Sequence, residues 1–367
     1  MRKASIYLAI GLMMCLLVAG FSFTGCQRSP KEGETMEAEE SISPDKMGPG
    51  ELKADYSDEV YYWGSMYSGL PLFKGHDIWA LHQKGKELGV QTKVFGPEGY
   101  DMAAYISSIE QIAAQKDTAG IIMLGWGDEM IPVINETIEK GVPIVLVDSD
   151  VPGSNRLAFC GTDWYKLGWY QAEGMLEHIG NEKGKVALMG IVNMTIMQDG
   201  FRGFTDYMKE HAPGQIEVLE PVDEENSTEV AAKITADYIS AYPDLIGVAG
   251  FSSQDGPGIA LAVKEAGKAG KVRVTCVSWE EQHLSYLKEG VIQRAVGQKR
   301  EFFTYYGLQL VFDAVHNTPP IQFTIDDKGA GITNLPDLIY TGFIIATQDN
   351  VDILLESRKR EREKYKE

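Results

Sequence analysis

Polar and aromatic side chains gather in seven short segments, each of which follows an apolar run of the chain. They supply carboxylates, carboxamides, hydroxyls and aromatic rings, which hydrogen-bond to a polar molecule and stack on its faces. The segments span residues 67–73, 125–129, 148–152, 162–165, 193–199, 252–258 and 278–282. Their chemistry favours the binding of a small polar ligand.

Combinations of residues that indicate catalysis or metal binding are weak in the same segments. Asp-Ser-Asp at 148–150 has the spacing of the DxD pattern of metal-dependent sugar transferases, yet it directly ends an apolar run. Gly-Trp-Gly at 125–127 lacks the third glycine of a dinucleotide fingerprint. His76 and His82 are not four residues apart, so one helix face would not present both to a metal. We therefore expect neither catalysis nor a cofactor or metal.

Short apolar runs rich in Val, Ile and Tyr alternate with segments of helical spacing. Gly89, Gly141 and Gly267 follow helical segments, as glycine commonly does where a helix ends. Strands that alternate with helices form parallel sheets covered on both faces, and such strands are apolar throughout. We therefore predict an α/β fold whose polar segments lie beyond the carboxyl ends of strands, where open sheets bind ligands. The predicted strands are residues 60–66, 91–95, 120–124, 143–147, 157–160, 185–191, 216–219, 245–251 and 272–277.

The first residues have the layout of a secretory signal. Two basic residues precede an apolar run over 6–23, and Thr-Gly stands directly before Cys26. This ending resembles the bacterial lipobox, whose cysteine receives a lipid; an uncleaved transmembrane anchor is the alternative. We expect a signal peptide over residues 1–25, then a lipidated Cys26 and a flexible tether through residue 58. The folded part would lie outside the cytoplasm, in the periplasm or at the outer face of the cell membrane.

Composition narrows the choice of partners. A formal net charge of −19, with no basic segment to offset it, argues against nucleic acid or an anionic lipid surface. Cys160 and Cys276 lie in separate apolar runs, so we expect free, buried thiols rather than a disulfide. Residues 357–367 are nearly all charged and are expected to form a solvated tail or a fraying helix rather than a binding element.

The order and spacing of several motifs resemble the type I periplasmic binding proteins, in the ribose- and galactose-binding branch that serves ABC transporters. The resemblance runs from about residue 60 to residue 346. Its motifs are Leu-Pro-Leu-Phe at 70–73, Gly-Val-Pro-Ile-Val-Leu-Val-Asp at 141–148, Gly-Thr-Asp at 161–163 followed by Leu-Gly at 167–168, Asp-Gly-Phe-Arg-Gly-Phe at 199–204, and Ala-Val-Gly-Gln at 295–298.

This resemblance implies two similar lobes, each a parallel sheet with helices on both faces, joined by a hinge that the chain crosses three times. The N-terminal lobe would hold residues 59–163 plus 299–323, and the C-terminal lobe residues 164–298 plus 324–356. The ligand would bind in the cleft between the lobes and favour their closure.

The resemblance also places ligand-binding residues along the cleft. Asp148 matches an aspartate that accepts hydrogen bonds from sugar hydroxyls, and Phe73 matches an aromatic residue that stacks on the sugar ring. Asp163 and Gln298 match polar positions at the first two hinge crossings. The whole predicted set is Tyr67, Phe73, Lys74, Trp126, Asp148, Ser149, Asp163, Trp164, Met197, Gln254, Asp255, Trp279, Glu280 and Gln298.

Departures from the ribose-binding pattern bear on the ligand. Ser149 and Met197 stand where those relatives have arginines, so the site lacks their fork-shaped donors. Lys74 or Arg202 could donate in their place. Acceptors and aromatic rings without such cations favour a neutral sugar, polyol or nucleoside-like ligand over a phosphate or a carboxylate.

Together these features predict an extracytoplasmic solute-binding lipoprotein that captures a sugar or sugar-like ligand and delivers it to an ABC permease. The alternative is a sensor that uses the same binding fold to present the sugar to a membrane receptor or a histidine kinase. The residues alone leave both partners open.

Overall fold

A computed structural model describes residues 55–316 and 335–364. The chain divides into two units, Met1–Gly48 and Pro49–Glu367, and every described residue belongs to the second. The predicted signal peptide, Cys26 and most of the tether lie outside the described residues. Among the residues that are described, no helix is long and apolar enough to cross a membrane.

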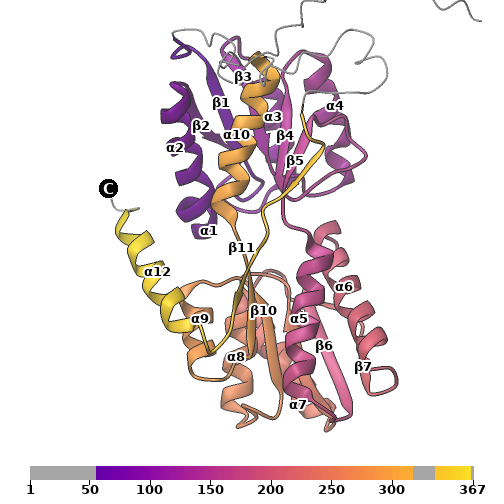
Figure 1. The fold of residues 1–367 in the computed structure, drawn as a ribbon. Helices are drawn as coiled ribbons and strands as arrows, with labels where there is room; N and C mark the ends of the chain where they lie inside the picture. Colours follow the sequence, from indigo (N-terminus) through magenta and orange to yellow (C-terminus); the bar gives the residue numbers. More distant parts are fainter. Residues whose placement is uncertain (1–54, 317–334, 365–367) are drawn as a thin grey trace, which may run out of the picture. The chain divides into compact units, whose positions relative to one another are not determined.

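The first of two sheets has six parallel strands (Figure 1). Their order is β12 (Leu338–Tyr340), β5 (Ala158–Gly161), β4 (Ile144–Asp148), β3 (Thr118–Met123), β1 (Val60–Gly64) and β2 (Gln91–Phe95). Helices α2 (Trp79–Leu88) and α10 (Arg300–His316) cover one face of this sheet. Helices α3 (Met102–Ala113) and α4 (Ile131–Glu139) cover the other face.

The second sheet has seven strands, of which six follow the order β13 (Phe343–Ala346), β11 (Arg294–Gln298), β10 (Arg273–Val277), β9 (Leu245–Gly250), β6 (Gly184–Gly190) and β7 (Ile216–Val218). The two-residue β8 (Val222–Asp223) pairs with β6, and only β13 is antiparallel to its neighbour. Helices α5 (Trp164–Ile179) and α6 (Thr195–His211) cover one face. The other face packs against α7 (Thr228–Ala241), α8 (Asp255–Glu265), α9 (Glu281–Lys288) and α12 (Val351–Lys364).

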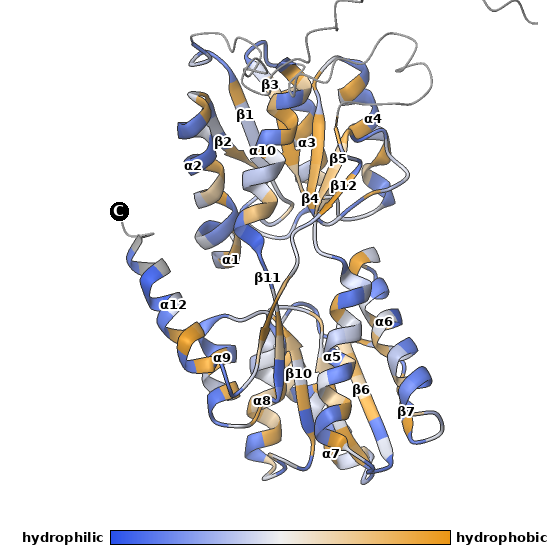
Figure 2. Ribbon diagram, viewed as in Figure 1, coloured by the Kyte–Doolittle hydropathy of each residue, from blue (hydrophilic) through white to orange (hydrophobic). Residues whose placement is uncertain are grey.

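The central strands are apolar on both faces, as the sequence predicts. In β1, Tyr61 and Trp63 pack in the core below α2 and α10, whereas Tyr62 packs in the core of α3 and α4. Figure 2 shows the same pattern, with apolar strands between helices that carry their polar residues outward. The predicted α/β fold with two parallel-sheet lobes is confirmed. Cys160 and Cys276 are free and buried, one in each sheet.

The chain crosses between the sheets three times: after β5, after β11 and between β12 and β13. The first two crossings lie beside Asp163 and Gln298, where the sequence placed them. The third differs from the expectation, which assigned residues 324–356 to the C-terminal lobe. Residues 338–340 instead pair with β5 in the first sheet, and the chain crosses at Gly342, whose φ of 81° suits glycine. Only three residues form this edge strand, and so short an apolar run cannot be recognised as a strand in the sequence.

Candidate functional site

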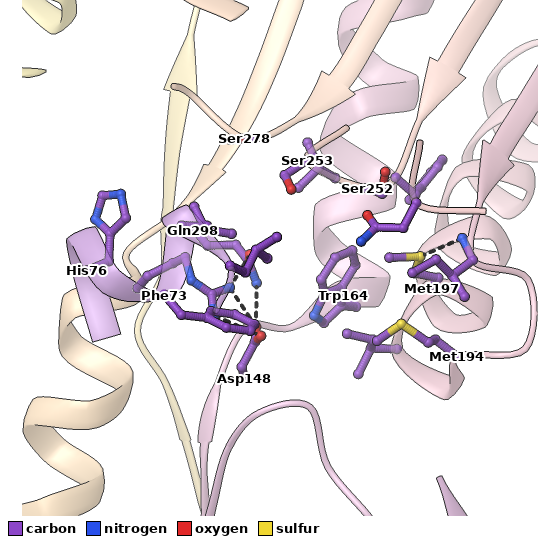
Figure 3. Close-up of a pocket in the computed structure, with 18 of the residues that line it drawn as sticks. Phe73, His76, Asp148, Trp164, Met194, Met197, Ser252, Ser253, Ser278 and Gln298 are labelled. Atoms are coloured by element: carbon purple, nitrogen blue, oxygen red, sulfur yellow. Dashed lines mark hydrogen bonds and ion pairs between the residues drawn. The ribbon is translucent and has the colours of Figure 1, made fainter. Parts of the chain in front are cut away.

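A cavity of about 80 Å³ lies where the carboxyl ends of strands from both sheets meet (Figure 3). Three groups of residues line it. Segments attached to the first sheet supply Leu70, Leu72, Phe73, His76, Trp126 and Asp148. Segments attached to the second sheet supply Trp164, Ile191, Met194, Ile196, Met197, Asn226, Phe251, Ser252, Ser253, Val277, Ser278, Trp279 and Glu280. The second hinge crossing supplies Gln298 and Arg300.

A buried polar cluster occupies the hinge side of this cavity. Arg300 is the first residue of α10, and its Nη1 and Nη2 donate to the two oxygens of Asp148 at 3.0 and 2.9 Å. Its Nε and Nη2 donate to Asp77 at 3.0 and 3.1 Å. Gln298 donates from Nε2 to Asp148 Oδ1 at 3.2 Å, and Figure 3 shows these two side chains pointing toward one another. One guanidinium thus pairs with two carboxylates, so Asp148 is ion-paired before any ligand arrives, and the three groups when ionised carry one net negative charge.

Burial and charge act in opposite directions on Arg300. Burial alone would lower the pKa of Arg300, but the nearby Asp148 and Asp77 carboxylates outweigh it and raise the pKa above its ordinary value. The guanidinium is therefore a fixed cation. A carboxylate accepts about four hydrogen bonds, and Asp148 already accepts three, so it keeps about one acceptor position for a ligand.

Aromatic side chains form much of the rest of the wall. Phe73 is buried beneath the Arg300 guanidinium, which lies 5.0 Å from the centre of its ring. Trp126 and Trp164 also line the cavity, and their indole nitrogens have no hydrogen-bond partner among the described residues. A ligand with acceptor oxygens would satisfy these donors, since a buried N–H without a partner costs free energy.

The backbone departs from common conformations at two matching places. Asp148, at the end of β4, has a φ of 65°, and Ser278, directly after β10, has a φ of 82°. Residues other than glycine rarely adopt such values, and they concentrate at functional sites. Both residues line the cavity, one from each sheet. These two turns aim side chains at the same space from opposite lobes.

A second charged cluster joins the lobes at the edge of the cavity. We call it the cross-lobe cluster, and it consists of His76, Glu280, Glu301 and Arg358. His76 lies in the short helix η2 (Lys74–Ile78) of the first lobe, with Nδ1 2.5 Å from Glu301 Oε1 and Nε2 3.1 Å from Glu280 Oε1. From α12, Arg358 pairs with Glu280, lies 2.8 Å from His76 Nε2 and stacks 4.5 Å from the Trp279 ring.

The carboxylates control ionisation in the cross-lobe cluster. Burial alone would lower the pKa of His76, but Glu280 and Glu301 outweigh it and raise this pKa to about 9. Burial alone would raise the pKa of Glu280, yet His76 and Arg358 lower it to about 2. At neutral pH the cluster therefore holds two cations and two anions. It has no net charge with which to attract an ionic ligand.

Eight of the fourteen predicted site residues line this cavity, from both lobes and the hinge. They are Phe73, Trp126, Asp148, Trp164, Met197, Trp279, Glu280 and Gln298. In Figure 3, Trp164 projects from α5, and Met194 and Met197 lie at the start of α6. The shared location supports a common role for these residues.

The structure places the other predicted residues elsewhere. Asp163 caps α5 by accepting from the Lys166 N–H at 2.9 Å. Ser149 donates to the Gly125 carbonyl. Asp255 accepts from the backbone N–H of Phe251 and Ser252, both at 2.7 Å, so it shapes a loop of the wall without lining the cavity. Tyr67, Lys74, Ser149, Asp163 and Asp255 are absent from the lining, and Gln254 borders a neighbouring cavity.

The two alternative donors do not reach the cavity either. Arg202 is exposed and pairs with Asp199 on its own helix, and Lys74 points to the surface. The fork-shaped donor that the sequence lacked after Asp148 comes instead from Arg300. Among the described residues, no group of three or more His, Cys, Asp and Glu side chains could hold a metal ion.

Comparison with known families decides the identity of this fold. The family model for the periplasmic binding protein domain matches residues 71–318. The chain belongs to the periplasmic binding protein family. A search of curated proteins finds no match to it.

Solved structures of other periplasmic binding proteins have the same two-lobed fold. The sugar-binding protein of a sugar ABC transporter from Bacillus halodurans is 27% identical, with a TM-score of 0.70 over 81% of this chain and 99% of that one. AraP, an arabinose binding protein from Geobacillus stearothermophilus, is 27% identical, with a TM-score of 0.69 and the same coverage. GanP, a glucose-galactose binding protein from the same organism, is 23% identical, with a TM-score of 0.70 and again that coverage, and supports the fold.

Sequence reasoning missed Arg300 and His76 as site residues of this periplasmic binding protein. Arg300 stands two residues after the hinge glutamine, at the start of a helix, where an arginine ordinarily faces solvent. The signal that could have found it is a cation placed directly at a hinge crossing between two buried segments. His76 carries no such signal, because its partners Glu280 and Glu301 are more than two hundred residues away in the chain.

Proposed function

We propose that this chain is a solute-binding lipoprotein that captures a neutral sugar between its lobes and delivers it to an ABC transporter without chemical change. The observation that carries the proposal is the cavity itself, in which an ion-paired acceptor, aromatic walls and unpaired indole N–H groups surround one space. Sugars match this arrangement, because their hydroxyls hydrogen-bond while the apolar faces of their rings stack on aromatic residues. The two 27% identical relatives, one sugar-binding and one arabinose-binding, support this ligand class.

The proposed mechanism is closure of one lobe on the other. A ligand that touches Asp148 from the first lobe and Ser278 from the second binds the closed form better than the open form, and so shifts the population toward closure. A permease that recognises the closed form would then collect loaded protein. Delivery to a transporter is preferred over presentation to a sensor kinase because the Bacillus halodurans relative is described as part of a sugar ABC transporter.

Export and anchoring complete the proposal. Family membership implies an extracytoplasmic location, and the apolar run over 6–23 followed by Thr-Gly-Cys26 supports a cleaved signal and a lipidated cysteine. In the proposed division, residues 1–25 are removed and residues 26–58 tether the lobes to the membrane. Mass spectrometry of the exported protein tests this division: a mature chain that begins at a diacylated Cys26 supports it, and an intact N-terminus contradicts it.

A thermal-shift screen of the purified full chain tests sugar capture. Monosaccharides, disaccharides, polyols and nucleosides are screened at neutral pH, and a ligand at a hundredfold excess over its Kd should raise Tm by about 5 °C. Asp148→Asn and Gln298→Ala should abolish the shift, whereas Asp237→Asn, on an exposed face of α7, should retain it. If the folded chain shows no change in Tm with any of these compounds, the proposal is wrong.

A further inference from the structure

A second cavity, of about 340 Å³, adjoins the first along the cleft. The two cavities share five lining residues, which form the boundary where they meet and are here called the neck: Leu70, Leu72, His76, Ser253 and Glu280. The second cavity is also bordered by both lobes, because its walls come from the segment around Pro71 and from residues 253–257 and 280–283. Its volume lies within the range of small-molecule sites, which is roughly 300–1,000 Å³.

The lining of the second cavity matches the surface of a sugar ring. Gln254, Gln282, Thr228 and Ser253 offer carboxamides and hydroxyls. The Thr228 hydroxyl lies 3.2 Å from Gln254 Oε1 and donates toward the Gln254 carbonyl groups, which leaves the amide NH₂ of Gln254 to donate to a ligand. Pro71 and other apolar side chains provide a dry surface for the face of a ring. No unpaired charge enters this wall, since Arg358 and Glu280 neutralise one another.

His283 supplies an independent sign that a polar ligand belongs there. It lines the second cavity and is only 2% exposed, yet neither ring nitrogen makes a hydrogen bond of good geometry with any described residue. Burial lowers the pKa of His283 to about 4, against weaker opposing effects of Glu280 and the Ser253 backbone. A neutral imidazole has one donor and one acceptor. A sugar hydroxyl, which both donates and accepts, complements it.

We propose that the second cavity is a subsite for the second ring of a neutral disaccharide whose first ring occupies the cavity beside Asp148. This inference rests on the proposed sugar-binding function. The shared neck lets one ligand enter both cavities, and the paired charges of the cross-lobe cluster at the neck disfavour an ionic ligand. Specificity for length would then reside in the second cavity, while the ring type is selected in the first.

Isothermal titration calorimetry of the full chain at neutral pH tests the subsite. The probes are matched pairs: D-glucose with cellobiose and with maltose, D-galactose with lactose, and D-xylose with xylobiose. One disaccharide should bind about tenfold more tightly than its monosaccharide, which corresponds to about 1.4 kcal/mol and is within reach of two added hydrogen bonds. The double variant Gln254→Ala/Gln282→Ala should raise the Kd of that disaccharide about tenfold and leave the Kd of the monosaccharide within about twofold.

Two controls separate the subsite from general damage to the protein. Gln111→Ala, on an exposed face of α3, should change neither Kd. The single variant Gln282→Ala removes only an exposed side chain, so it reports on the subsite even if the Gln254 change disturbs its loop. If monosaccharides bind but no disaccharide binds more tightly, or the double variant weakens both lengths equally, the subsite is overturned and sugar capture stands. If no saccharide of either length binds, the proposed function falls together with the subsite.

Discussion

Arg300 is the residue on which the electrostatics of the cleft depend. It is 5% exposed, and both Asp148 and Asp77 rely on it for a counter-charge. The three charges are buried together, which is costly unless each is paired. In this arrangement Asp148 can accept from a ligand while it remains ion-paired with Arg300. A neutral ligand fits such a site better than an anion, because the Arg300 guanidinium is already shared between two carboxylates.

Replacing Arg300 tests this dependence. Arg300→Met keeps much of the side-chain volume but leaves two buried carboxylates without a counter-charge, so we expect the free energy of unfolding to fall by about 3–5 kcal/mol. Urea denaturation of the full chain at neutral pH measures the change. Arg202→Met is the matched control, because Arg202 is exposed and its pair with Asp199 contributes little. Equal stability of the two variants would show that Arg300 does not balance these charges.

His76 should make stability depend on pH. Its pKa of about 9 lies above the ordinary value, so its contribution is fully present below about pH 6.5 and is lost as pH rises through 9. The shift corresponds to roughly 3 kcal/mol at most. Between pH 6.5 and 9.5 the wild-type chain should therefore lose up to that much more unfolding free energy than His76→Gln. Parallel pH profiles of the two proteins would mean that His76 is already neutral in the cross-lobe cluster.

Single residues could be predicted from sequence only where a local pattern marks them. Phe73, Asp148 and Gln298 stand at the ends of motifs, directly after buried segments, and they line the cavity. The pairing of Arg300 with Asp77 joins residues 223 positions apart, and no local pattern encodes it. Burial of charge depends on such distant partners. Polar residues in loops were also wrongly predicted to bind ligand where their side chains hydrogen-bond to the backbone instead. Asp163 caps α5, and Asp255 holds the turn after β9.

Elements were more predictable than side chains, because hydrophobic runs and glycines are local signals. The predicted strands match β1 to β10 closely, except that no apolar run marks the two-residue β8. β11 was not among the predicted strands, although its residues carry the Ala-Val-Gly-Gln motif at 295–298. The C-terminal tail shows the limit of this reasoning. Residues 357–364 continue α12, and Arg358 is 6% exposed against Trp279, although their charges predicted a solvated tail or a fraying helix. A single buried arginine in a charged segment cannot be distinguished from its exposed neighbours by composition.

Helices α5 and α6 pack so closely at Gly168 that any side chain there should destabilise the protein. A Cβ added there would lie 1.9 Å from the Gly200 carbonyl oxygen, which is backbone and cannot turn aside. We expect Gly168→Ala to lower the free energy of unfolding by about 3 kcal/mol, because separating the helices outweighs the higher helix propensity of alanine. Gly75→Ala is the control, since no atom lies within 4 Å of the added Cβ. Comparable Tm values for the two variants would contradict the packing argument.

For the whole molecule, the central property is the coupling of ligand binding to lobe closure. The cross-lobe cluster joins η2 and α10 of the first lobe to the loop after β10 and to α12 of the second. Opening the lobes breaks the His76–Glu280 pair, whereas the Glu280–Arg358 pair lies within the second lobe and holds Glu280 in place. The cluster therefore stabilises the closed form whether or not a ligand is present, and it changes ligand affinity through that equilibrium.

Arg358→Ala should therefore weaken the binding of a monosaccharide, although α12 lies outside the cavity beside Asp148. The variant removes the partner of Glu280, which is partly exposed, so a loss of about 1 kcal/mol and a Kd about fivefold higher are expected. The change should appear as faster dissociation, because the ligand leaves from the closed form, which the cluster stabilises. Stopped-flow tryptophan fluorescence with the tightest-binding monosaccharide of the thermal-shift screen separates the association rate from the dissociation rate.

Arg360→Ala is the control, because Arg360 lies two residues further along α12 and is exposed. It should leave both rates unchanged. A slower association rate with unchanged dissociation would instead mean that α12 guides the ligand into the open cleft rather than holding the lobes closed.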